Sequence, residues 1–338
     1  MNMLTFSEAL RNSSGQSKRH LLLGNGFSIA CRPNIFLYGR LFENANFSSL
    51  SASAKESFEA LETEDFERVI KTLMDARRIL SVYSDNVGIS ERLKQDAAAL
   101  KELLVQTLAS SHPGHPGELN DSEYMHCRAF LDNFDNIYTL NYDLLLYWVC
   151  MHCAEGEKPT ADDGFRKPFE NYDADYVTWE PQNTHKQSIF FLHGALHLFD
   201  AGYELRKFTW VNTNVRLIEQ ARTAIKGNLF PVFVSEGTSK EKMERIRHND
   251  YLAKAYRSFV EITGALFVYG HSLAENDEHF LAGIENGKVR QLYVGIYVDP
   301  TSEANKKIIR RAMHMVDVRS KANLEVFFYD ASTARVWN

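Results

Sequence analysis

Short apolar runs alternate with amphipathic stretches along most of the chain. Three leucines at 21–23 precede a Gly-Asn-Gly turn, and six further runs follow beyond residue 120. These runs are NIYTL (136–140), SIFFLH (188–193), LFPVFV (229–234), GALFVYG (264–270), LYVGIYV (292–298) and LEVFFY (324–329). Near-continuous apolar strands separated by helices are typical of a parallel sheet that helices cover on both faces. The pattern predicts an α/β fold with a doubly wound, mostly parallel, Rossmann-like sheet.

Residues 36–118 interrupt this pattern with apolar positions at helical spacing. In 64–80 these positions are Phe66, Val69, Ile70, Leu73 and Leu80, and in 91–109 they are Leu93, Ala97, Leu100 and Leu104. The segment SSHPGHPGEL then carries two Pro-Gly turn signals that end the helical pattern. We therefore expect one domain over residues 1–338, with a helical insertion or cap at 36–118.

Composition and charge restrict the class of protein. The 338 residues are 44% hydrophobic and 12% aromatic, which is ample for a packed core. The net charge of −6 does not indicate a nucleic-acid partner. No apolar run approaches the roughly 18 residues that span a bilayer, and the first twenty residues lack the pattern of a signal peptide. These features predict a cytoplasmic protein with no membrane partner.

Small, polar or titratable residues follow five of the predicted strands. The segments are Gly24-Asn25-Gly26, Asn141-Tyr142-Asp143, His193-Gly194, Ser235-Glu236-Gly237-Thr238 and Gly270-His271-Ser272-Leu273, with Asp277 shortly after the last. In open α/β sheets, ligands bind beyond the carboxyl ends of the strands. Together the five segments predict a polar cleft along that edge of the sheet.

Each segment taken alone also permits a structural interpretation. The glycine turn at 24–26 fits either a phosphate cradle or a plain corner, and Ile29 stands where a dinucleotide fingerprint has its third small residue. This disfavours an ordinary Rossmann dehydrogenase. Asn141 and Asp143 offer an amide beside a carboxylate, or an Asx turn that caps a helix starting at Asp143. A lone histidine is usually structural, but His193 at a strand end is a candidate for proton transfer near neutral pH.

Four of these motifs, in their order along the chain, resemble those of the sirtuin-like NAD-binding fold. They are Gly24-x-Gly26-x-Ser28, Thr139-x-Asn141-x-Asp143, His193-Gly194 and Gly270-x-Ser272-Leu273, spread over residues 20–285. The combination is more similar to bacterial sirtuin-like NAD hydrolases than to deacylating sirtuins. The chain has one C-x-x-C, at 150–153, and lacks the second pair of the sirtuin zinc module. Protein deacylation is therefore disfavoured, and no metal is expected.

The resemblance implies NAD as the substrate and a role for each matching residue. Asn141 would contact the nicotinamide-side ribose and position the attacking water, Asp143 would support Asn141, and His193 would be the general base. The Gly24–Ser28 turn would hold the pyrophosphate, and Gly270 and Ser272 would bind the adenosine side. The implied NAD-binding residues are Gly24, Asn25, Gly26, Phe27, Ser28, Thr139, Gly194, Gly270, Ser272 and Asp277.

The expected function is hydrolysis of the bond between nicotinamide and ribose. The same resemblance implies a role in bacterial defence against phage through NAD depletion, with a homo-oligomer or a protein partner that triggers activity. One alternative is a sensor module that binds NAD or an ADP-ribose-type nucleotide without turnover and regulates a partner. A second is an interaction protein in which the glycine turns serve no ligand.

Overall fold

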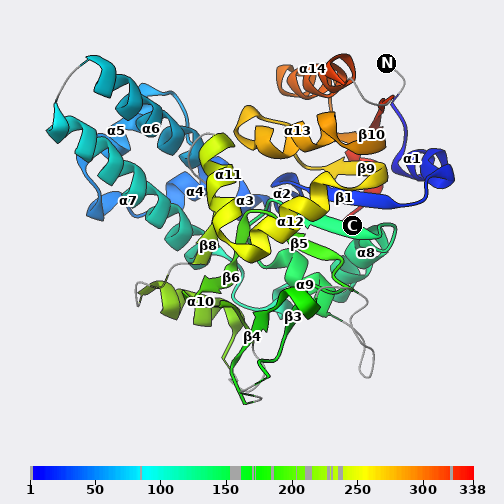
Figure 1. Ribbon diagram of the computed structural model, residues 1–338, viewed down its shortest axis with the longest axis horizontal. Coiled ribbons are helices and arrows are strands. Elements are labelled where there is room, and N and C mark those ends of the chain that lie inside the picture. The colour runs from blue at the N-terminus through cyan, green and yellow to red at the C-terminus, as the bar shows by residue number, and fades with distance from the viewer. Residues whose placement is uncertain are drawn as a thin grey trace.

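Six parallel strands form the central sheet of the computed structural model (Figure 1). The structure describes residues 3–83, 86–152, 161–169, 171, 173–183, 186–202, 204–209, 215–226, 229, 231–234, 239–319 and 323–338. The strands are β1 (Arg19–Leu23), β2 (Asn136–Thr139), β5 (Ile189–Phe191), β9 (Thr263–Tyr269), β10 (Lys288–Ile296) and β11 (Glu325–Asp330). They pair in the order β11-β10-β9-β1-β2-β5, and all pairs are parallel. The predicted α/β class with a Rossmann-like parallel sheet is confirmed.

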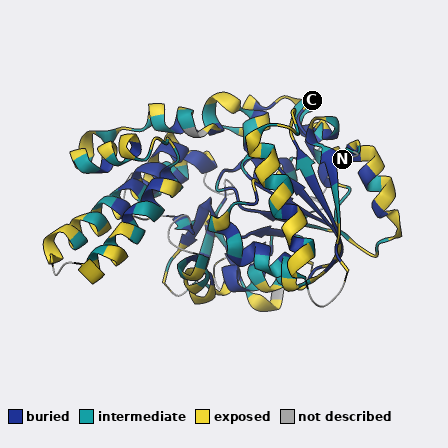
Figure 2. Cartoon of the chain, turned by 90° about the horizontal axis from the view of Figure 1, so that it is seen from above, coloured by how far each residue is buried: buried dark blue, intermediate teal, exposed yellow. Residues whose placement is uncertain are grey.

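Helices pack on both faces of this sheet. The Tyr269 ring lies 5.4 Å from Phe130 of α8 (Asp121–Leu131), and Phe6 of α1 (Phe6–Asn12) packs on the same face. On the opposite face, Tyr138 lies 5.2 Å from Phe259 of α12 (Asp250–Val260). The strands are buried between these layers, as Figure 2 shows, which explains why their sequences are nearly continuous apolar runs.

The direction in which the sheet grows reverses beside β1. From β1 the chain adds β2 and β5 on one side, and it then returns to add β9, β10 and β11 on the other side. The carboxyl ends of β1 and β9 therefore flank a topological switch point. Ligands bind at such points because the two connections leave in opposite directions and open a crevice.

A second, antiparallel sheet of five strands was not predicted. Its strands are β3 (Phe165–Arg166), β4 (Tyr176–Trp179), β6 (Gly194–Asp200), β7 (Leu205–Phe208) and β8 (Pro231–Phe233), in the order β3-β4-β7-β6-β8. The expectation that 229–234 belongs to the parallel sheet is wrong, because β8 pairs antiparallel with β6. An apolar run shows that a strand is buried but does not identify its partner strand. β8 starts at a proline, a residue that strands tolerate at their first position.

The helical character of residues 36–118 is confirmed. The segment contains α4 (Tyr38–Asn44), α5 (Ala52–Ala60), α6 (Phe66–Tyr83) and α7 (Val87–Ser111), with 3-10 turns at Phe47–Ser49 and Pro116–Glu118. The long pair α6 and α7 extends away from the sheets, while the start of α6 lies over the strand ends (Figures 1 and 2). Phe66, Val69, Ile70 and Leu73 are buried as their spacing predicts, and Leu80 is half-buried.

The remaining helices connect and cover the strands. They are α2 (Gly26–Cys31), α3 (Pro33–Phe36), α9 (Leu145–Met151), α10 (Leu217–Lys226), α11 (Ser239–His248), α13 (Glu278–Asn286) and α14 (Glu303–Val318), with 3-10 turns at Ser13–Gly15, Pro181–Asn183, Glu275–Asp277 and Ala331–Ala334. Within the described ranges, no helix has both the length and the apolar character needed to cross a membrane.

Candidate functional site

The two glycine turns at the switch point pack directly against each other. The Gly24 N–H donates to Tyr269 O over 3.0 Å, and the Gly26 N–H donates to Gly270 O over 2.8 Å. A Cβ on Gly26 would lie 2.5 Å from Gly270 Cα, and Gly270 itself has a φ of +69°. The close approach therefore requires glycine on both sides. Two backbone N–H groups of the expected phosphate cradle are used within the protein.

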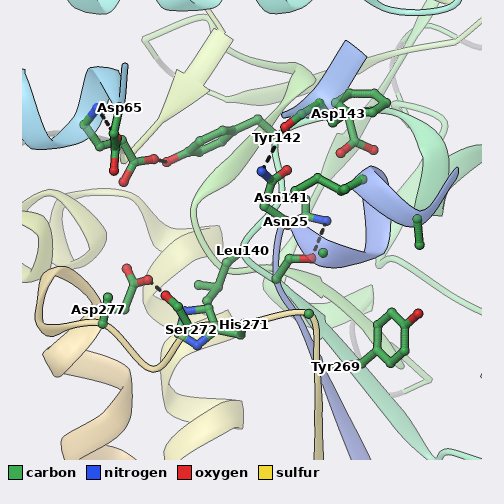
Figure 3. Close-up of a pocket in the computed structure, with 18 of the residues that line it drawn as sticks. Asn25, Asp65, Leu140, Asn141, Tyr142, Asp143, Tyr269, His271, Ser272 and Asp277 are labelled. Atoms are coloured by element: carbon green, nitrogen blue, oxygen red, sulfur yellow. Dashed lines mark hydrogen bonds and ion pairs between the residues drawn. The ribbon is translucent and has the colours of Figure 1, made fainter. Parts of the chain in front are cut away.

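A cavity of about 610 Å³ opens at the carboxyl ends of the parallel strands. Figure 3 shows its lining, with Asn25 and Tyr269 on one side and Asp65 and Asp277 on the other. The predicted site residues that line it are Gly24, Asn25, Gly26, Asn141, Asp143, His193, Gly270, Ser272 and Asp277. Four of the five predicted strand-end segments thus contribute to one cavity. The fifth, 235–238, lies outside the described residues, as does Cys153 of the C-x-x-C.

Asn141, Ser28 and Asp143 form a buried hydrogen-bond network between β1 and β2. Asn141 Nδ2 donates to Gly24 O over 3.1 Å and to Ser28 Oγ over 3.0 Å, and the Ser28 hydroxyl donates to Asp143 Oδ2. Burial raises the pKa of the Asp143 carboxyl, although its hydrogen bonds oppose the shift. The network holds the Asn141 amide in one orientation, which leaves its Oδ1 as the amide atom that can face a ligand.

The Asx turn that the sequence also permitted is present. Asp143 Oδ1 accepts the Leu145 N–H over 2.9 Å, and Thr139 Oγ1 accepts the Asn141 N–H over 3.0 Å. The helix expected to begin at Asp143 begins instead at Leu145, because the intervening residues form this turn. Asp143 therefore has a structural role, whatever it contributes to a ligand.

Four of the predicted NAD-binding residues lie behind the cavity wall. Phe27, Ser28 and Thr139 are at most 1% exposed, and the Phe27 ring packs 5.0 Å from Trp337. Gly194, with a φ of +82°, begins β6, and a Cβ there would lie 1.8 Å from Val232 O. These residues shape the site through packing and hydrogen bonds rather than by lining it.

A cluster of buried ionisable groups surrounds Asp277. His271 Nε2 lies 2.9 Å from Asp277 Oδ2, Lys242 Nζ lies 3.4 Å from Oδ1, and His193 Nε2 lies 3.6 Å from Oδ1. The Leu273 N–H donates to His271 Nδ1 over 3.1 Å, so Nε2 carries the proton that His271 donates to Asp277. Leu273 holds this geometry with a φ of +53°, which is unusual for a side-chain-bearing residue.

In this cluster the acid Asp277 is ionised at neutral pH, whereas the base His193 is neutral. Burial opposes ionisation of Asp277, but the hydrogen bond from His271 and the charge of Lys242 outweigh it and keep its pKa well below the usual range. Burial lowers the pKa of His193 well below its ordinary value, against the attraction of Asp277. At neutral pH the arrangement therefore places a neutral imidazole beside a carboxylate.

The helical insertion adds two carboxylates to the cavity wall, Asp65 and Glu67. Glu67 accepts hydrogen bonds from the Tyr142 hydroxyl and from Asn276 Nδ2, both at 3.2 Å, and lies 3.7 Å from Lys242 Nζ. Burial raises the pKa of Glu67 to about 7, although the positive charge of Lys242 opposes the shift. The insertion is thus part of the site.

Sequence reasoning missed several of these residues. His271 stands in a segment that was singled out, between Gly270 and Ser272, so its position after a strand was an available signal. Glu67 adjoins the apolar positions of α6, and Lys242 is 1% exposed within the highly charged helix α11. No local pattern distinguishes these two from charged residues on a solvated helix face.

His193, Asp277 and His279 also have the composition of a metal site. Their donor atoms lie within 4.8 Å of one another, and no other such group occurs among the described residues. His193 Nε2 and His279 Nε2 are 3.3 Å apart. The buried ammonium of Lys242, 3.4 Å from Asp277 Oδ1, would repel a cation at this position. The donor set therefore does not fit a metal ion well.

The fold and the cavity define the class of the molecule. It is a Rossmann-like α/β protein with a cavity at the switch point of its parallel sheet, lined by both apolar and ionisable side chains. The chain belongs to the family described as a domain of unknown function (DUF4917), whose model matches residues 21–337. This match includes both sheets and the helical insertion. The comparison with curated proteins gives no match.

Proposed function

We propose that this protein is an NAD hydrolase that releases nicotinamide and leaves ADP-ribose. The observation that carries the proposal is the single cavity at the switch point, where Asn141, His193 and the two glycine turns converge. Its volume of about 610 Å³ is within the range of sites that take nucleotide-sized ligands. The resemblance of the same residues to sirtuin-like motifs supports NAD as the nucleotide.

The chemistry requires a positioned water and a stabilised cation. The bond between ribose C1′ and the nicotinamide nitrogen breaks, and its electron pair neutralises the nicotinamide. Water then bonds to C1′ and gives up a proton. In this proposal Asn141 Oδ1 holds the water, and His193, which is neutral at pH 7, accepts the proton. Asp277, 3.6 Å from His193 Nε2, stabilises the imidazolium that forms.

The test is nicotinamide release from NAD by the full chain and by Asn141→Ala and His193→Ala. Each variant should lose about 10²–10³ in kcat, the usual effect of removing one stabilising group from such a site. The exposed residues Asn286 and His248 provide matched controls, and Asn286→Ala and His248→Ala should keep wild-type rates. Tm values establish that each variant is folded. Turnover that survives both site substitutions would contradict the proposal.

One observation favours a second candidate, a sensor that binds NAD or an ADP-ribose-type nucleotide without cleaving it. Both hydrogens of the Asn141 amide are used within the protein, by Gly24 O and Ser28 Oγ. An amide held this way has a structural role that does not need catalysis. Calorimetry with NAD separates the two functions, since saturable binding without nicotinamide release supports the sensor.

A further inference from the structure

Glu67 is a carboxylate in a mostly apolar part of the cavity wall. It is contributed by α6 of the helical insertion, and its side chain is 19% exposed at the cavity wall. The insertion's other contributions to the wall are mostly apolar, such as Phe36, Phe66 and Leu104. Burying a carboxylate among such residues costs free energy unless an interaction compensates for it.

The neighbouring acid, Asp65, has a different and sufficient role. Its Oδ1 accepts the Glu67 N–H over 2.9 Å and the Arg68 N–H over 3.2 Å, so it caps the start of α6. Among the described residues, no backbone N–H donates to the Glu67 side chain. Its hydrogen bonds come from Tyr142 and Asn276, the residues that directly follow Asn141 and directly precede Asp277. Lys242 connects Glu67 to Asp277, which lies 3.6 Å from His193 Nε2, so Glu67 is close to the His193 part of the proposed catalytic site.

We propose that Glu67 is a catalytic residue of this site, whose carboxylate accepts hydrogen bonds from the hydroxyls of the ribose being cleaved and stabilises the positive charge that develops on that ring. The inference rests on the proposed NAD hydrolysis. A carboxylate has about four acceptor positions, and the hydrogen bonds from Tyr142 and Asn276 occupy two of them. Asn276 Oδ1, buried without a hydrogen-bond partner among the described residues, adds an acceptor at the same wall.

The carboxylates of the cavity also favour one orientation of a bound dinucleotide. Glu67 and Asp277 are two carboxylates that share one ammonium, Lys242, among the described residues. Gly26, Gly270 and the uncharged Asn305 also line the cavity, as does Asp143, whose carboxyl accepts hydrogen bonds from the Ser28 hydroxyl and the Leu145 N–H. The cationic nicotinamide end is favoured beside the carboxylates, whereas the anionic pyrophosphate is disfavoured there. Glu67 therefore acts on the reacting end and takes no proton in the step.

Ion pairs hold the insertion in this position. Lys242 of α11 lies between Glu67 and Asp277, and the neighbouring Glu241 pairs with Arg78, also on α6. The α6–α11 contact therefore fixes the carboxylate against the strand ends. It also gives residues 36–118 a direct role in the proposed chemistry.

The experiment compares kcat and KM for NAD in the wild type, Glu67→Gln and Asp65→Asn at about pH 8, above the Glu67 pKa of about 7, so that the wild-type carboxylate is ionised. Glu67→Gln keeps the size of the side chain but removes its charge and replaces one of its two acceptor oxygens by an NH₂ donor, and we expect kcat to fall about 10²-fold or more. Asp65→Asn removes a carboxylate from the same wall while keeping a good capping residue, so kcat should fall less than about ten-fold. The Kd for ADP, which lacks the reacting ribose, should be unchanged in Glu67→Gln.

The outcomes separate this inference from the function on which it rests. A wild type that releases no nicotinamide contradicts NAD hydrolysis itself. A wild type that turns over NAD, with Glu67→Gln equal to Asp65→Asn, overturns only the role of Glu67. Weakened ADP binding in Glu67→Gln would show a general disturbance of the cavity and would also overturn that role.

Discussion

Replacing Glu67 by glutamine should make the fold more stable at high pH. The Glu67 pKa is 4.5 in an unperturbed chain and about 7 in the fold, where burial disfavours the ionised form. Each pKa unit corresponds to about 1.4 kcal/mol, so folding with an ionised Glu67 costs about 3 kcal/mol. Glutamine avoids this cost because it carries no ionisable proton. The prediction concerns the free energy of unfolding and holds whatever the ligand is.

The sign follows from proton binding. Below pH 4.5 the carboxyl is protonated in both the folded and the unfolded state, and it adds no pH dependence. Between pH 4.5 and pH 7 the unfolded chain releases this proton while the fold retains it, so the stability of the wild type falls as the pH rises. Above about pH 7 the loss is complete and constant.

The assay is urea denaturation of the wild type and Glu67→Gln at pH values from 4.5 to 8.5, with circular dichroism as the signal. The difference in unfolding free energy, variant minus wild type, should rise by about 3 kcal/mol across this range and then level off. Glu59→Gln, at an exposed position of α5, is the control and should run parallel to the wild type. A difference that stays flat or falls with pH would refute the raised pKa of the buried Glu67.

Two further substitutions test the packing beneath the cavity. Ser28→Ala leaves Asp143 Oδ2 and one Asn141 N–H unpaired, so the free energy of unfolding measured with urea should fall by about 2–3 kcal/mol. In a double-mutant cycle with Asn141→Ala, the combined loss of stability should be smaller than the sum of the two single losses. Simple additivity would contradict the network. Gly270→Ala forces a Cβ to within 2.6 Å of Gly26 Cα at a positive φ, so it should lower stability by at least about 2 kcal/mol, whereas Gly15→Ala, with open space around it, should be near neutral in the same assay.

The parallel sheet could be predicted because its burial on both faces leaves a local signal. Runs such as 264–270 are apolar throughout, and they correspond to β9 and its neighbours. The antiparallel sheet could not be predicted in this way. The run at 188–193 ends in a turn at Leu192-His193, and the buried β6 follows at once from Gly194. His193-Gly194 marks the strand end but not that the chain enters a second, antiparallel sheet there.

The residues of the candidate site show the same difference between positions that the local sequence identifies and positions that it does not. Asn141, His193 and Ser272 were identifiable because a strand end is a position that sequence can locate, and all three line the cavity. Glu67 and Lys242 were not, because their burial depends on where α6 and α11 pack. A charged residue near an apolar helix face has the same local sequence whether solvent or a cavity lies beside it. Only the packing of the helix in the fold determines whether such a residue is buried.

The residues that first suggested a ligand are therefore not those that test it best. Gly26 and Gly270 are required by the contact between their own turns, so their presence would be explained without any bound phosphate. Mutual packing does not explain Glu67 in the same way, since a buried acid with a raised pKa weakens the fold. A feature that costs stability and faces a cavity calls for a functional compensation. Substitution at Glu67 therefore tests whether the site is functional. Substitution at Gly26 or Gly270 tests only the packing of the two turns.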